Sequence, residues 1–399
     1  MLKPVKYLFC VAALAASSSY AAPTNTNYEV IEEPAMRAPE ATSAAMLKLA
    51  QTAERTFAVG DYGIVLFRDE QGGDWQQAQV DTSVLLTSVD FADNQHGWAV
   101  GHHGVIIHSQ DGGESWQRQL DGFDILELQK VSFEQQLNEF QTELENADEA
   151  TAEELAFEIE NLEYELESLA FALESEGPTR PLLSVLAFNK NEVLVAAAYG
   201  QMLKTSDGGA TWQLISERLD NERGYHYNAF SYDGTYTYIA AESGTFYRSP
   251  DRGESWEQID FPYNGSLFGT HIDNNSRLWV YGLRGHVFYS DDQGESFTRS
   301  MSGTRVNLSG STLSENGNTL VVGHSGVITM FNQNGQLIKL MEHASGDVLT
   351  DIVAHDDGTY TLVGQGGVLT FSAPTLPVDG MPTTAAKQAP APTAAQGQE

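Results

Sequence analysis

The chain has almost no cysteine and few basic residues, and both shortages exclude classes of protein. Cys10 is the only cysteine among 399 residues, so the rest of the chain has no disulfide, no catalytic thiol and no cysteine-ligated metal. Lysine and arginine number 21 against 55 aspartates and glutamates, a formal net charge of −34. A field of this sign argues against nucleic acid and direct binding to anionic membranes.

Long apolar runs are also missing. The one candidate, YLFCVAALAA, is too short to span a bilayer and follows Lys3 and Lys6. Small residues in SSSYA come next. This order predicts a secretory signal peptide over 1–21, cleaved near Ala21, and export to the periplasm or beyond the cell. At the other end, residues 373–399 are rich in Pro, Ala, Thr and Gln, which predicts a disordered tail.

Between the ends the chain repeats a unit of about 41 residues, the length of a four-stranded propeller blade. Segments such as FAVGDYGIVLF and WAVGHHGVIIH align on one glycine: Gly63, Gly104, Gly200, Gly244, Gly285, Gly326 and Gly367. The spacings are 41, 96, 44, 41, 41 and 41, so the second holds one period and an insertion of 55 residues. The pattern predicts an all-β, seven-bladed β-propeller over 22–372.

A second motif, SQDGGESW, recurs as TSDGGATW, SPDRGESW and SDDQGESF. Its glycines suit a left-handed turn, its aspartate and hydroxyls can bind turn amides, and its aromatic can pack between blades. These structural positions are Asp111, Gly113, Trp116, Asp207, Gly209, Trp212, Asp251, Gly253, Trp256, Asp292, Gly294 and Phe297. We expect Gln333 at the aspartate position of blade six and Pro374 at that of blade seven. Four equivalent aspartates cannot share one active site, so no catalytic role is assigned to them.

These boxes are similar to the Asp-box (BNR) repeats of sialidases and sortilins. The fuller unit, with L-x-S-V-x-F before GWAVGHHGVIIHSQDGGESW, resembles the photosystem II stability/assembly-factor family of seven-bladed propellers. The resemblance covers about 28–372 apart from the insertion and suggests a bacterial relative outside the photosynthetic branch. It implies a non-enzymatic, exported protein that binds membrane-complex subunits during assembly. The family's arginine-rich patch has no counterpart that can be aligned in this acidic chain.

The insertion, residues 124–178, predicts an antiparallel helical hairpin of the coiled-coil type. Leucines and isoleucine from Leu155 to Leu173 step by 4, 3, 4, 3 and 4, and Phe133 to Leu144 repeat the pattern. Thr151 with Glu154 predicts the capping box of the second helix. Asp124 to Glu176 carries 17 acidic residues and one lysine. The hairpin is either a solvated cover for the propeller or a docking arm for a basic partner surface.

Because strands alternate in direction, the hairpin and the glycine turns should share one face of the propeller. The candidate binding residues are Asp61, Tyr62, His102, His103, Tyr199, Glu242, Arg284, His324 and Gln365. Ordinary turn polarity is the competing interpretation of these residues. Neighbouring histidines on a turn diverge, so no metal and no cofactor are predicted. Blade seven has no fourth strand of its own, and we expect Tyr28–Ile31 to supply it.

The function predicted is an assembly or stability factor, or scaffold, for a membrane protein complex, acting as a monomer through protein–protein binding. A periplasmic or secreted propeller that binds sugar or lipid is an alternative. A sialidase-like glycoside hydrolase is a further one. It needs an arginine cluster, a tyrosine nucleophile and an acid/base carboxylate, and the chain has no Phe-Arg-Ile-Pro-like start of a sialidase domain.

Overall fold

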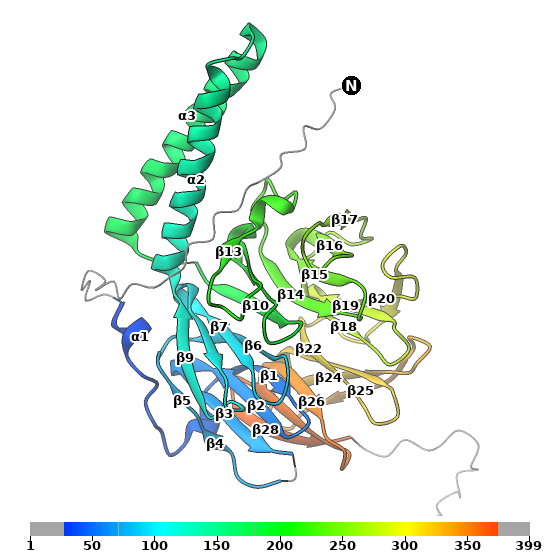
Figure 1. Cartoon of the computed structure of the whole chain (residues 1–399). Helices are drawn as coiled ribbons and strands as arrows, with labels where there is room; N and C mark the ends of the chain where they lie inside the picture. The colour runs from blue at the N-terminus through cyan, green and yellow to red at the C-terminus, as the bar shows by residue number, and fades with distance from the viewer. Residues whose placement is uncertain (1–27, 71, 179, 374–399) are drawn as a thin grey trace, which may run out of the picture.

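The structure, a computed structural model, describes residues 28–70, 72–178 and 180–373. Within them seven antiparallel sheets surround a central channel as propeller blades, and a helical hairpin projects beyond them (Figure 1). The predicted fold class is confirmed. The predicted signal peptide, and the tail beyond Ala373 with Pro374, lie outside the described residues.

The first strand of each blade lines the channel, and the later strands follow outward. Blade one contains β1 (Met46–Gln51), β2 (Arg55–Gly60), β3 (Val65–Asp69) and β4 (Gln76–Gln77), and blade two contains β6 (Leu86–Phe91), β7 (Gly97–Gly101), β8 (Ile106–Ser109) and β9 (Ser115–Leu120). Blade three contains β10 (Leu182–Ala187), β11 (Val193–Ala197), β12 (Met202–Thr205) and β13 (Gln213–Leu214). Blade four contains β14 (Tyr227–Tyr232), β15 (Thr237–Ala241), β16 (Phe246–Ser249) and β17 (Glu257–Ile259). The short strand β5 (Gln79–Val80) pairs in parallel with β9 at the rim of blade two.

Blades five to seven complete the ring. Blade five contains β18 (Leu267–Ile272), β19 (Leu278–Gly282), β20 (His286–Ser290) and β21 (Thr298–Met301). Blade six contains β22 (Leu308–Leu313), β23 (Thr319–Gly323), β24 (Val327–Phe331) and β25 (Leu337–Glu342). Blade seven contains β26 (Leu349–Ala354), β27 (Thr359–Gly364) and β28 (Gly367–Ser372). The second strand of each blade is buried on both faces because it lies between two neighbouring blades. Small residues suit this crowding: a Cβ at Gly101 would lie 2.2 Å from the carbonyl oxygen of Leu85.

One kind of tight turn joins the second and third strands in six blades. The turns are η3 (Asp61–Gly63), η4 (His102–Gly104), η6 (Ala198–Gly200), η8 (Glu242–Gly244), η9 (Leu283–Gly285) and η10 (His324–Gly326). The first residue donates its backbone N–H to the residue before the first strand, as His102 does to Leu85 at 2.9 Å. Blade seven has a shorter turn, yet Gln365 donates to Val348 in the same way at 3.1 Å. The shared bond holds all seven turns against the channel-lining strands.

The Asp box closes the turn between the third and fourth strands of blades two to five. In blade two, Asp111 Oδ1 accepts the N–H of Ser115 at 3.0 Å, and Oδ2 accepts its hydroxyl at 2.6 Å. The same two bonds recur at Asp207, Asp251 and Asp292. Trp116 packs in a core that includes Phe57 of blade one. Trp212, Trp256 and Phe297 occupy the next three blade boundaries, so each box fastens a turn and fills a boundary.

Each box is also capped by a polar side chain of the preceding blade. The carbonyl oxygen of the residue after the aspartate accepts the bond, as Gly112 does from Arg55 at 2.8 Å. The remaining pairs are Gln119 with Gly208, Lys204 with Arg252, and Arg248 with Gln293. Blade six preserves the arrangement, because Arg277 donates to the Gln333 carbonyl at 2.7 Å. These bonds link neighbouring blades at the face opposite the glycine turns.

The predicted place of Gln333 is wrong by one residue. Asn332 takes the role of the aspartate in blade six, since its Oδ1 accepts the N–H of Gln336 at 2.9 Å. A side-chain amide makes this turn as a carboxylate does, because both present an oxygen at the same reach from the backbone.

The predicted closure by an N-terminal strand is also wrong. Blade seven has three strands, and Glu29–Glu32 forms the short helix α1 beside blades one and two. The Val30 carbonyl accepts the N–H of Ser83 at 2.9 Å, and the Ile31 carbonyl accepts a bond from Arg118 at 2.9 Å. Ile31 itself is buried in the core between these blades. The segment therefore bonds two of its carbonyls to blades one and two and buries its apolar side chain between them.

The ring closes instead through the first strands of blades one and seven. The Nζ of Lys48 lies 3.0 Å from Asp351 Oδ2, and the Leu49 N–H donates to the same oxygen at 3.0 Å. The Thr350 hydroxyl donates to the Met46 carbonyl at 2.9 Å. Side-chain bonds across the seam replace the shared strand.

The insertion forms α2 (Gly122–Leu144) and α3 (Glu149–Phe171), followed by a wider helical turn, Ala172–Glu176. Leu155, Leu162 and Leu169 are buried in the predicted seam. The predicted capping box of Thr151 and Glu154 is wrong: Asp148 caps α3 by accepting the Thr151 N–H at 3.0 Å, so the helix starts sooner. No helix in the described part of the chain is long and apolar enough to cross a membrane.

Candidate binding surface

The turn face, the ring of glycine turns at one mouth of the channel, presents most of the predicted residues to solvent. Tyr62 is 67% exposed and Tyr199 is 60% exposed. The other exposed members are His102, Arg284, His324 and Gln365. Asp61, His103 and Glu242 are partly buried. The structure thus gathers the nine residues from seven separate segments onto one face.

Residues other than glycine occupy a backbone conformation at the turn tips that glycine adopts more easily. The φ angles there lie between 55° and 59° in six blades: Tyr62, His103, Tyr199, Ser243, Arg284 and Ser325. A left-handed conformation costs a non-glycine residue about 1 kcal/mol. Strain of this kind gathers at functional sites. The tips therefore carry side chains at some expense of stability, a feature that they share with Arg252 and Gln293 in the Asp boxes of the opposite face.

Two of the nine side chains, those of His103 and Glu242, form hydrogen bonds within the molecule. His103 lies with Nδ1 at 2.9 Å from the carbonyl oxygen of Pro178, at the exit of the hairpin. The Glu242 carboxylate accepts the N–H of His226 at 3.0 Å. Over the described ranges, no group of three or more histidines, cysteines or acidic residues is placed to hold a metal ion.

The hairpin rises from the turn face, as predicted, and its base is firmly packed. A Cβ at Gly104 of η4 would lie 2.6 Å from the Cα of Gly122 at the start of α2. The Tyr28 ring packs edge-on against Phe123 of α2, with centroids 5.4 Å apart, and against His103 at 5.8 Å. Ile125 belongs to the core between blades two and three. The base of the hairpin is therefore anchored in the propeller.

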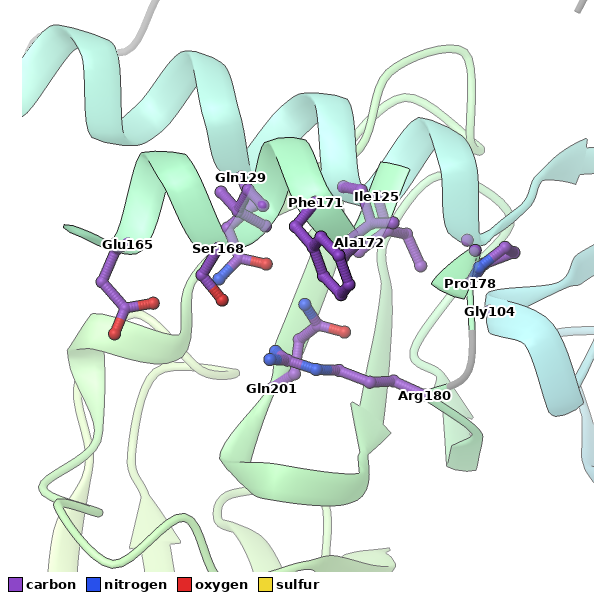
Figure 2. A pocket seen from close by; sticks show the side chains of 14 residues that line it. Gly104, Ile125, Gln129, Glu165, Ser168, Phe171, Ala172, Pro178, Arg180 and Gln201 are labelled. Atoms are coloured by element: carbon purple, nitrogen blue, oxygen red, sulfur yellow. The ribbon is translucent and has the colours of Figure 1, made fainter. Parts of the chain in front are cut away.

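A cavity of about 190 Å³ lies between the hairpin base and the propeller, where Gly104 of η4 and Gln201, the residue after η6, line it. Figure 2 shows Phe171 of α3 pointing toward Arg180 and Gln201 across it. The guanidinium of Arg180 lies 5.9 Å from the ring centroid of Tyr199, and it forms no ion pair within the part of the chain that the structure describes. Arg180 therefore lines the cavity at the hairpin base and also contacts the predicted Tyr199.

Sequence reasoning missed Arg180. It stands outside every repeat, so no alignment of blades reveals it. One signal was present: Arg180 is the only arginine between Arg118 and Arg218, and it follows directly on the acidic insertion.

The channel holds a second cavity, of about 380 Å³, lined by the first strands. Asp90, the carboxylate among its lining residues, and Asp351, which pairs with the lining residue Lys48, are both engaged in structural contacts. Asp351 pairs with Lys48, and Asp90 Oδ2 accepts the N–H of Ala187 in blade three at 2.8 Å. Burial raises the pKa of Asp90 to about 6, although backbone N–H bonds from Ala187 and Phe91 and the charge of Lys48 act in the other direction. These carboxylates join blades, which leaves neither free to act on a substrate.

Fold and surface together define a seven-bladed β-propeller of the Asp-box type, with a turn face and one helical projection on the same side. Residues 41–140 match the family model described as Photosynthesis system II assembly factor YCF48. Residues 200–345 match that of Sortilin, neurotensin receptor 3. Over residues 41–140 the chain is thus similar to the YCF48 family, and its whole fold is similar to that of solved YCF48 propellers. Whether it comes from a bacterium outside the photosynthetic branch stays a prediction.

Several solved structures share the fold at low sequence identity. One described as YCF48 bound to D1 peptide has 15% identity and a TM-score of 0.56, covering 86% of this chain and 95% of that one. YCF48 from Cyanidioschyzon merolae has 13% identity and a TM-score of 0.54, covering 84% and 97%. Streptogramin B lyase has 10% identity and a TM-score of 0.59, covering 82% and 93%. No curated protein matches the chain.

Proposed function

We propose that the protein is a non-enzymatic assembly or stability factor that holds a subunit of a membrane protein complex on its turn face, after export to the periplasm or beyond the cell. The observation that carries the proposal is the placement of the hairpin. It rises from the face on which the seven turns present exposed tyrosines, histidines and an arginine. A YCF48 structure that holds a D1 peptide supports peptide binding by a propeller of this kind.

Rigidity supports a binding role for this face. The turns are tied to the channel strands by backbone bonds, and the hairpin base is packed into the core between blades two and three. A surface that is already ordered loses little conformational entropy when a partner binds. The Asp-box face has a different chemistry: its aspartates and several of its basic side chains are consumed by bonds within and between blades.

The same structure argues against catalysis in the channel. A glycoside hydrolase needs two carboxylates free to act as acid, base or nucleophile. Asp90 and Asp351 bind backbone N–H groups of the neighbouring blade, and Asp351 is also neutralised by Lys48. Nothing in this arrangement leaves a carboxylate available to a substrate.

The experiment that tests the proposal is crosslinking and affinity capture from the native membrane fraction. The full chain is compared with a turn-face variant, Tyr62→Ala with Tyr199→Ala and Arg284→Ala. A matched control, Lys190→Ala with Asn275→Ala, changes exposed residues in turns on the opposite face. We expect the full chain and the control to capture subunits of one membrane complex and the turn-face variant to lose them. Equal capture by all three, or capture of no membrane subunit by the full chain, would overturn the proposal.

A further inference from the structure

Helix α3 has a second apolar stripe, on the side away from its partner helix. Phe157, Tyr164 and Phe171 are 62%, 71% and 58% exposed and follow one another at intervals of seven residues. The seam with α2 is made by other residues, among them the buried Leu155 and Leu162. At 100° per residue the two stripes lie about half a helical turn apart. The aromatic stripe, as we call these three residues, is therefore not needed to hold the hairpin together.

Acidic side chains flank the aromatic stripe with the same spacing. On one side stand Glu153, Glu160 and Glu167, each four residues before an aromatic; on the other stand Glu158 and Glu165, each one residue after. All five are exposed, and none takes part in an ion pair within the described ranges. Rows of charge beside an apolar stripe are the arrangement by which helices choose an oppositely charged partner helix.

The charges select among the possible occupants of the stripe. A second copy would bring another hairpin with a formal charge of −16 against the first, and like charges in contact oppose association. Anionic lipid is repelled for the same reason. A cationic helix with an apolar stripe satisfies both features at once, because its apolar side chains cover the aromatics while lysines or arginines meet the glutamate rows.

The spacing favours a helix over an extended peptide. Successive aromatics lie about 10.5 Å apart along the axis, two turns of an α-helix. A partner helix with its own seven-residue stripe keeps this register over all three aromatics. Side chains on one face of a strand repeat every 6.8 Å or so, which loses register after one step. At the base, Phe171 borders the cavity that Arg180 closes (Figure 2), so the stripe runs into a hollow able to take one further side chain.

We propose that the outer face of α3 docks a basic amphipathic helix of the partner, with Phe157, Tyr164 and Phe171 as its apolar anchors. This inference deepens the proposed function, on which it rests for the membrane-complex partner, and assigns the hairpin a role separate from that of the turn face. Exposed aromatics on a preordered surface supply large contact area at small entropic cost.

The test uses the full chain and a synthetic helical peptide with leucines at seven-residue spacing and flanking lysines. The stripe variant is Phe157→Gln with Tyr164→Gln and Phe171→Gln, which keeps every charge. The matched control, Met301→Gln with Leu340→Gln, changes apolar residues that are 69% and 43% exposed on blades five and six. We expect the stripe variant to bind the peptide at least tenfold more weakly and the control to match the unchanged protein. Helical circular dichroism should be the same in all three, because the substituted side chains are exposed.

Two further probes separate shape from charge. A peptide with glutamates in place of the lysines should not bind, and raising salt from 50 to 300 mM should weaken the lysine peptide, because exposed charges are screened. Equal affinity of the stripe variant for the lysine peptide would overturn the inference. So would binding of the aromatic stripe to phospholipid vesicles, or a dimer of the full chain that the stripe variant dissolves.

The outcome is distinguishable from failure of the proposed function. If the stripe variant still captures the membrane subunits that the turn-face variant loses, the inference about α3 fails and the assembly-factor proposal stands. If the lysine peptide binds through the stripe but no membrane subunit is captured by the full chain, the docking site stands and the assembly-factor proposal fails.

Discussion

Lys48 and Asp351 occupy equivalent positions on the first strands of blades one and seven, and their ion pair closes the ring. The third residue of each first strand holds this position, and in the other five blades it is small: Ser88, Ser184, Ala229, Gly269 and Gly310. Asp351 is 3% exposed, and 40% of the Lys48 side chain is accessible within the channel. Burial opposes the charge of Lys48, and the neighbouring Asp351 outweighs it and raises the pKa of the amine.

The seam pair predicts a non-additive mutational pattern. Asp351→Ser alone leaves Lys48 without its anion, and we expect the free energy of unfolding to fall by about 3 kcal/mol. Adding Lys48→Ser should restore part of the loss, because serine is native at this position in two blades, where its hydroxyl accepts the N–H of the next first strand at 3.3 Å. Urea unfolding of both single variants and the double variant measures the coupling. Losses that simply add would contradict the role given to the pair.

The caps on the Asp boxes predict that Arg248 stabilises the boundary between blades four and five. Its guanidinium binds the Gln293 carbonyl at 2.7 Å and Glu295 at 2.7 Å. Arg248→Ala removes a nearly buried group and leaves that carbonyl without its donor, so we expect a loss of about 2–4 kcal/mol in unfolding free energy. Arg299 is exposed and forms no ion pair among the described residues, and Arg299→Ala should change stability by less than about 0.5 kcal/mol. Thermal unfolding decides, and equal effects would count against the caps.

The raised pKa of Asp90 predicts a pH dependence of opposite sign to that of the boxes. The folded protein binds this proton more tightly than the unfolded chain, so the contribution of Asp90 to stability increases as pH falls through about 6. Relative to an Asp90→Asn variant, the unchanged protein should gain about 1–2 kcal/mol between pH 7.5 and 5. Urea midpoints at several pH values measure the difference. A difference that is flat with pH would show that Asp90 titrates normally.

At lower pH the box aspartates act the other way. Hydrogen bonds within the boxes outweigh the opposing effect of burial and lower the pKa values of Asp111, Asp207 and Asp251 below the usual 3.8. Their stabilisation is complete above that value and is lost as pH falls through the lowered pKa values. The loss of unfolding free energy as pH falls below about 4 should therefore remain in the Asp90→Asn variant.

The N-terminal segment predicts a contrast between neighbouring residues. Ile31 is 2% exposed in the core between blades one and two, and Val30 is 39% exposed. We expect Ile31→Ala to lower the free energy of unfolding by about 2–4 kcal/mol and Val30→Ala to lower it by less than about 1 kcal/mol. Differential scanning calorimetry of the two variants is the measurement. Similar melting temperatures would mean that the segment is not part of the cooperative fold.

The strained turn tips predict a trade between stability and binding. Tyr62 has φ 57° and an exposed ring. Tyr62→Gly should raise the free energy of unfolding by up to about 1 kcal/mol, because glycine adopts this conformation without a clash. The same variant should capture less of the membrane partner than the unchanged protein. A variant that is more stable and binds equally well would show that the Tyr62 side chain, held in a strained conformation, is not needed for binding.

The repeat could be predicted from the sequence in most of its detail, because the glycine turn recurs in all seven blades and the Asp box in four of them. What lies between repeats could not. Lys48 and Asp351 are separated by most of the chain, and no sequence periodicity predicts their ion pair. The position of Ile31 depends on which blade has hydrogen-bond donors for the backbone carbonyls of its segment, and only the folded structure shows which blade that is. Asp148 and Asn332 were missed because an Asp or Asn oxygen fits more than one register in a short polar segment.

The candidate surface was predicted in outline only. Alternating strand directions placed the hairpin and the turns on one face, and the heptad pattern located the seam. The same pattern concealed the aromatic stripe, since Phe157, Tyr164 and Phe171 share the spacing of the leucines and differ only in the side of the helix they occupy. Arg180 needed the fold itself, because its partner Tyr199 belongs to another element.

The packed base of the hairpin has a consequence for the kinetics of capture. Under the proposed function, a partner that touches the hairpin first stays close to the turn face, because the hairpin base is packed into the propeller, and binding at the second surface becomes intramolecular. Each of the two contacts can then be weak and exchange quickly while the complex with the partner lasts much longer than either contact alone. Release would need only one of the two surfaces to be competed away, which suits the assembly role that we propose.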